Sequence, residues 1–226
     1  MKTTAARPIE DCLLDLFRHL GVEQAHIAAG GPPPLKDWHS LATLYPERVA
    51  SLTVISPPVV NPAGLAGLAS RMLVVAGDQG RLARGAAELT AGLSSVSAHI
   101  LRGYEWQPWS DVIADRGVEI AAAMLDFLDR HSLPAVRLSE AEGKVAEITY
   151  RIRGAGPPLF LIPLSLAPSQ WDPLIATLSA RYCTISLGGP LLGVVGILEE
   201  RGHSNYLTIV KSLLDLVDIR PNEVVL

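Results

Sequence analysis

The stretch from Ala25 to Val49 contains the best candidate for a catalytic turn in this chain. An apolar segment, His26 to Ala29, leads into Gly30, and a helix-like segment follows and ends near Pro46. A sharp strand-to-helix turn is the arrangement that presents the nucleophilic serine of a G-x-S-x-G motif. That motif places the nucleophile two residues after Gly30, at Pro32. Proline has no hydroxyl, thiol or carboxylate, so nucleophilic catalysis at this position is excluded.

The segments on both sides of this turn resemble the α/β-hydrolase family. LFRHLGVEQAHIAAG stands before the turn and LATLYPERVASLTVISP follows it. The spacing of Gly30 from Pro46 matches the family's spacing between the turn glycine and the proline of P-E-R-V. The resemblance implies an α/β fold and three further functional positions: an acid, a histidine and an oxyanion donor.

Each of these three implied positions carries a residue that is unsuited to its role. The acid position is Gly80; the nearby Asp78 could substitute, although a turn-forming aspartate is an equally good interpretation. The histidine position is Trp106, whose indole accepts no proton at neutral pH. The oxyanion position holds Pro163, which has no backbone N–H. We therefore expect a pseudoenzyme; the alternative is an active, esterase-like hydrolase with displaced catalytic residues such as Asp78.

Aromatic residues gather near the same positions. Tyr104, Trp106 and Trp109 fall within one short segment, and Trp38 follows the turn at Gly30. One interpretation is that these side chains fill the space that the catalytic residues have vacated. The other is that, together with Asp78, they form a binding surface for a small apolar ligand or a protein partner.

Histidines and cysteines offer no obvious second site. The 6 histidines fall on helix ends, strands and loops, and we expect none to be paired with a serine or cysteine. The neighbours Asp37–His39 and His203–Ser204 are expected to be solvated or capping residues. Cys12 and Cys183 lie far apart and are predicted to be buried thiols, and no Cys or His spacing indicates a metal site.

Hydrophobic periodicity predicts alternating strands and helices, which is typical of a mostly parallel sheet flanked by helices. The fold class is therefore α/β. Helices are expected over 8–20, 37–44, 82–93, 112–128, 170–182 and 204–217, and strands over 26–29, 51–56, 71–76, 97–101, 144–153, 159–166, 183–187 and 223–226.

The order of these elements indicates a circular permutation. Residues 1–131 resemble the closing half of the hydrolase fold, and residues 144–226 resemble its opening half, beginning with a strand and R-x-G-x-G-P-P. Residues 132–143 contain Pro134, several charges and Gly143, and are predicted to be a linker. We expect the two halves to pack as one domain.

The last residues suggest a continuation. The sequence stops inside the apolar run Val224–Leu226, so we expect a longer natural chain. LLDLVDIRPNEVVL resembles the lead-in to the glycine-rich loop of class I S-adenosylmethionine-dependent methyltransferases. That loop is absent from the sequence, so no cofactor is expected in this chain. The expected partners are a downstream catalytic domain or a second copy of the chain.

Composition excludes some classes of partner. The 226 residues are 49% hydrophobic and 19% charged, with a net charge of −4 and a pI near 5.9. Scattered Lys and Arg residues give no basic surface for nucleic acid, and the apolar runs are too short to span a membrane. No signal peptide is visible, and a cytoplasmic location is the resulting expectation.

Overall fold

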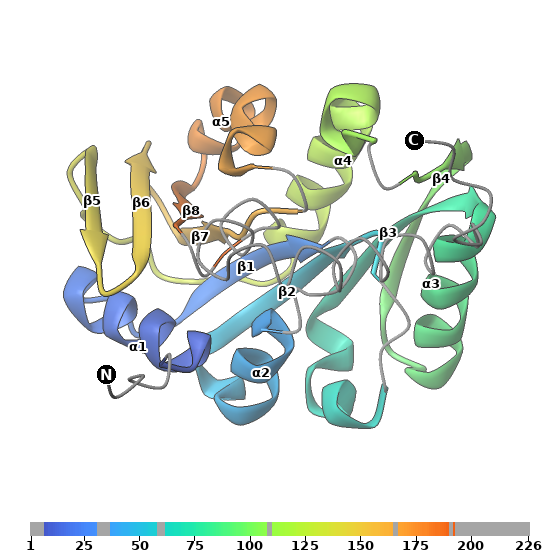
Figure 1. The fold of residues 1–226 in the computed structure, drawn as a ribbon, viewed down its shortest axis with the longest axis horizontal. Coiled ribbons are helices and arrows are strands. Elements are labelled where there is room, and N and C mark those ends of the chain that lie inside the picture. The colour runs from blue at the N-terminus through green and yellow to red at the C-terminus, as the bar shows by residue number, and fades with distance from the viewer. Residues whose placement is uncertain are drawn as a thin grey trace, which may run out of the picture.

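The computed structural model describes residues 7–30, 37–57, 62–107, 110–164, 167–189 and 192, without the side chains of residues 37–39. They form an eight-stranded sheet with helices on both faces, which confirms the predicted α/β class (Figure 1). The helices are α1 (Ile9–Leu20), α2 (Asp37–Leu44), α3 (Gly80–Gly92), α4 (Val112–Asp129) and α5 (Asp172–Ser179). The strands are β1 (Ala25–Gly30), β2 (Val49–Ile55), β3 (Met72–Gln79), β4 (Ser97–Glu105), β5 (Ala141–Val145), β6 (Ile148–Arg153), β7 (Pro158–Leu161) and β8 (Cys183–Gly188).

The sheet has the strand order β4-β3-β2-β1-β7-β8-β6-β5. The six strands from β4 to β8 are parallel, whereas β6 and β5 form an antiparallel hairpin at one edge. Every residue of β1, β2, β7 and β8 is buried. Strands covered on both faces read as continuous apolar runs, which explains why their sequences lack polar alternation.

Two helical layers cover the sheet. In Figure 1, α1, α2 and α3 lie on one face, and α4 and α5 lie on the other. The apolar stripe of α1 packs on the first face, where Phe17 and Phe160 have ring centroids 4.6 Å apart. Gly21 ends α1 with a φ of 64°, the left-handed conformation that glycine adopts without strain. Asp111 caps the N-terminus of α4 by accepting from two backbone N–H groups.

Strands from distant parts of the chain are neighbours. β1 lies between β2 and β7, and His26 is in register with both Ser51 and Leu159. One continuous sheet therefore contains strands from residues 25–105 and from residues 141–188.

Several elements differ from the periodicity-based expectations. β5 begins at Ala141, inside the segment expected to be a linker, and Val136 forms an isolated bridge with Gly156. β7 ends at Leu161 rather than Leu166, and the expected helix over 170–182 is a 3-10 turn (Pro168–Trp171) followed by the shorter α5. The elements predicted over 204–217 and 223–226 lie outside the described residues.

The strand β4 is longer than predicted because of a bulge. Gly103 has a φ of 67°, and the register between β3 and β4 shifts beside it. A left-handed residue at this point lets the strand continue to Glu105 instead of ending at Leu101.

Candidate functional site

The strand order of the sheet indicates where a ligand site is expected. From β1 the chain adds β2, β3 and β4 in one direction, whereas β7 and β8 extend the sheet in the other. Strand order therefore reverses between β1 and β7. In open parallel sheets, ligands bind outside the carboxyl ends of the strands at such a reversal point. The ends of β1 and β7, at Gly30 and Leu161, bring together the predicted turn and the predicted oxyanion position.

The turn glycine at the end of β1 is required by packing. A Cβ atom at Gly30 would lie 2.1 Å from the carbonyl oxygen of Ile55 on β2, so no larger residue fits without moving backbone. The helix α2 begins at Asp37 as predicted. Pro32 lies outside the described residues, and so does the side chain of Trp38.

Ile162, the first residue after β7, has both of its polar backbone groups hydrogen-bonded. The N–H of Ile162 donates to the carbonyl of Ala28 at 2.9 Å, and its carbonyl accepts from the indole of Trp171 at 2.9 Å. Pro163 follows and is buried, as is Leu164. The N–H of Ile162 is therefore already bound within the sheet, and Pro163 supplies no N–H for an oxyanion.

Trp106 and Tyr104 are buried rather than displayed. Their exposures are 7% and 9%, and both belong to the apolar cluster that includes Leu164 and Trp171. The hydroxyl of Tyr104 donates to the Asp115 carboxylate at 3.0 Å. Burial, aided by this carboxylate, raises the pKa of Tyr104 to about 12. Trp109, the third aromatic residue of this segment, lies outside the described residues.

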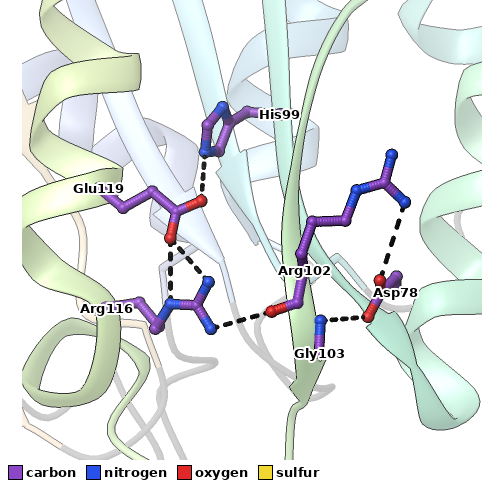
Figure 2. Close-up of polar contacts among 6 residues, drawn as sticks. All are labelled: Asp78, His99, Arg102, Gly103, Arg116 and Glu119. Atoms are coloured by element: carbon purple, nitrogen blue, oxygen red, sulfur yellow. Dashed lines mark hydrogen bonds and ion pairs between the residues drawn. The ribbon is translucent and has the colours of Figure 1, made fainter.

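Asp78 holds the bulge of β4 in place. Its carboxylate accepts from the backbone N–H of Gly103 at 2.9 Å and forms an ion pair of 3.8 Å with Arg102, as Figure 2 shows. Gly80 has a φ of 77° at the start of α3. The Asp78 carboxylate therefore stabilises the backbone of the β4 bulge, and this agrees with a structural role for the aspartate.

Ser56 is a feature of the crevice that sequence analysis did not identify. It follows β2, adjoins the end of β1, and is 1% exposed. Its φ of 48° lies in the left-handed region, and its Oγ has no hydrogen-bond partner among the described residues. Residues held in that region are strained, and such strain clusters at functional sites. No sequence pattern around Ser56 indicates this conformation.

A His–Glu–Arg cluster joins β4 to α4 (Figure 2). The Glu119 carboxylate contacts His99 Nε2 at 3.0 Å and accepts two N–H bonds from the Arg116 guanidinium. Arg116 interrupts the helical geometry of α4 with a φ of −136° and also donates to the Arg102 carbonyl. Hydrogen bonds from Arg116 are the main cause that lowers the pKa of Glu119. All three side chains are about one-third exposed, so the cluster serves to attach the edge strand to the helix.

The expectation that no histidine is paired with a serine is wrong. His26 Nδ1 lies 2.8 Å from Ser51 Oγ, because the parallel register places these residues side by side on β1 and β2. Both are 0% exposed, and the pair lies at the amino ends of the strands. Burial, with a smaller contribution from His131, lowers the pKa of His26 to about 4. A neutral, enclosed histidine at this edge has no substrate access.

The described residues also bear on the predictions for the cysteines, a metal site and a membrane span. Cys12 and Cys183 are both buried, as predicted, and burial raises the pKa of each thiol. No group of His, Cys, Asp and Glu side chains within the described ranges could hold a metal ion. Among the same residues, no helix is long and apolar enough to cross a membrane.

Comparison with known proteins adds no identification. No family model, curated protein or solved structure matches this chain.

Proposed function

We propose that this chain is a non-catalytic, circularly permuted α/β-hydrolase-like domain that acts as an accessory or binding module. The observation that carries the proposal is the composition of the crevice between β1 and β7. The described residues that follow β7, from Ile162 to Leu164, are buried, and the Ile162 carbonyl accepts from the indole of the fully buried Trp171. A crevice of this kind favours packing and recognition over acid–base chemistry.

The strand order supports the permuted hydrolase-like interpretation. In such a permutation, strands from the second half of the chain must lie beside the turn-bearing strand of the first half. The pairing of β7 with β1, in register at His26 and Leu159, satisfies this requirement.

An esterase assay tests the non-catalytic role. We expect the purified chain to hydrolyse p-nitrophenyl acetate no faster than its Ser56→Ala variant, and to resist labelling by a fluorophosphonate probe. Stoichiometric labelling of any serine, with turnover that the label abolishes, would overturn the proposal.

The alternative is an active hydrolase with displaced residues, and Ser56 is the observation that favours it. Ser56 has a strained conformation at the carboxyl end of a strand, where such strain accompanies functional sites, and the alternative requires that a base reach its unpartnered hydroxyl. This alternative predicts that Ser56→Ala and Asp78→Ala abolish turnover, while the control Ser94→Ala, in an exposed turn, leaves it unchanged.

The role of a methyltransferase-associated module rests on the resemblance of residues 213–226 alone. The reading frame beyond Leu226 tests it directly. A glycine-rich loop immediately downstream supports the association, and a stop codon at that point contradicts it.

A further inference from the structure

A surface concavity of about 520 Å³ lies beside β6 and β8, on the side of β7 away from β1. Its floor is formed by residues in register across the hairpin and β8. Glu142, Arg151 and Ser186 form one row, and Thr149 and Gly188 are paired in the next. Since paired residues of neighbouring strands project to the same face, these side chains share one surface.

The wall comes from the start of the α5 region. Pro168, Ser169 and Asp172 line the concavity from the 3-10 turn and the first residue of α5. A Cβ atom at Gly188 would lie 2.7 Å from Pro168 Cγ and 3.0 Å from Thr149 Oγ1. Glycine at this position therefore lets the wall meet the floor closely.

The concavity is rich in unused hydrogen-bonding groups. Thr149, Ser169 and Ser186 line it, and within the described ranges none of their hydroxyls has a protein partner. Arg151 forms an ion pair with Asp172, which neutralises both charges. The guanidinium has five N–H donors and the carboxylate several acceptor positions, so both can still bind a ligand.

We propose that this concavity binds a neutral, hydroxyl-rich ligand of the size of a monosaccharide. Hydroxyls both donate and accept, as sugar hydroxyls do, and the Arg151–Asp172 pair supplies a directed donor and acceptor. Glu142 is paired with Arg153 at 3.0 Å, as Arg151 is with Asp172, so the described lining residues hold no unpaired charge for a phosphate or carboxylate ligand. Its apolar surface comes mainly from Pro168 and Tyr150, because Leu187 is fully buried in the core, and two such residues are too few to hold a lipid chain. The volume lies within the range of about 300–1,000 Å³ typical of ligand pockets.

The test uses the full chain and a panel of D-glucose, D-galactose and D-mannose, with binding followed by isothermal titration and by ¹⁵N NMR. We expect at least one hexose to bind at millimolar concentration and to shift the amide signals of residues 142–151 and 186–188. Thr149→Val keeps the side-chain shape and removes one hydroxyl, so it should weaken binding about tenfold. Ser169→Trp should fill the concavity and abolish binding, whereas Ser94→Ala, an exposed serine elsewhere, should bind as the original chain does.

Three outcomes would overturn the proposal. One is the absence of binding by all three hexoses while the chain is folded. Another is sugar binding that neither Thr149→Val nor Ser169→Trp changes. The third is binding of inorganic phosphate in place of the sugars. The esterase assay is independent of all three, so failure of this proposal and failure of the non-catalytic role are distinguishable.

Discussion

The two ends of β1 and β2 differ in the residues that they carry. A polar pair lies at the amino ends, although functional residues of a parallel sheet usually lie at the carboxyl ends. At the amino ends, His26 and Ser51 lie 2.8 Å apart, a combination that could transfer protons, but they are sealed in the core. At the carboxyl ends, where ligands normally bind, Gly30 and Ser56 are accompanied by apolar side chains. The difference teaches that residue types capable of chemistry form a site only where substrate can reach them.

The largest expected effect concerns the apolar filling of the carboxyl end. Trp171 is 0% exposed and its indole donates to Ile162, so Trp171→Ala should lower the free energy of unfolding by about 3–5 kcal/mol. Urea denaturation measures this loss. Trp171→Phe keeps most of the volume and should lose much less. If the alanine variant were as stable as the original chain, Trp171 would not be tightly packed, and the apolar packing at the carboxyl end would not distinguish it from the amino end.

Acidification probes the amino end. Folded His26 has a pKa of about 4 and the unfolded residue one near 6.5, so below pH 6.5 the unfolded chain binds a proton that the folded chain does not. Stability should therefore be full above pH 6.5 and fall by about 3 kcal/mol as the pH approaches 4.

The control for this pH dependence is His26→Asn, which cannot titrate. Its stability should be flatter between pH 6.5 and 4 than that of the original chain. The pKa of His131 is also lowered, chiefly by burial, so the difference between the two proteins isolates the contribution of His26. Identical pH profiles would show that His26 is protonated or accessible in the folded state.

Loss of the hydroxyl partner should have an intermediate effect. Ser51→Ala leaves His26 Nδ1 buried without its hydrogen bond, so the free energy of unfolding should fall by about 1–3 kcal/mol. Thermal denaturation at neutral pH measures it. An unchanged free energy of unfolding would imply that the His26–Ser51 hydrogen bond does not stabilise the amino ends of β1 and β2.

The smallest expected effect has the opposite sign and sits at the other end of β2. Glycine adopts the left-handed conformation of residue 56 without strain. Ser56→Gly therefore relieves the strain that serine bears there, and it also removes a buried, unpartnered hydroxyl. We expect stabilisation of about 1 kcal/mol, measured by the same denaturation. Destabilisation would indicate that the hydroxyl has an unrecognised partner, and would strengthen the displaced-hydrolase alternative.

The fold was largely predictable because its determinants are local. Apolar runs such as SLTVIS and RMLVVA predict buried parallel strands, and the helical stripe of α1 predicts its packing face. The bulge at Gly103 was not predictable, because it depends on the contact with Asp78, 25 residues away on β3.

The site was less predictable because its features depend on register. The contact of His26 with Ser51 arises only once β1 and β2 are aligned, and no spacing within the sequence encodes it. The left-handed φ of Ser56 is likewise imposed by its surroundings. That Gly80, Trp106 and Pro163 cannot serve as an acid, a base or an oxyanion donor follows from residue type alone.

The position of β1 between β2 and β7 constrains how the chain acquires its structure during synthesis. The partner strand β7 emerges about 130 residues after β1, so one edge of β1 stays unpaired while α2, α3 and α4 are being made. An open, apolar strand edge invites association with other chains. The segment that ends at α4 therefore depends on the second half of the chain, or on a chaperone, to protect its central strand.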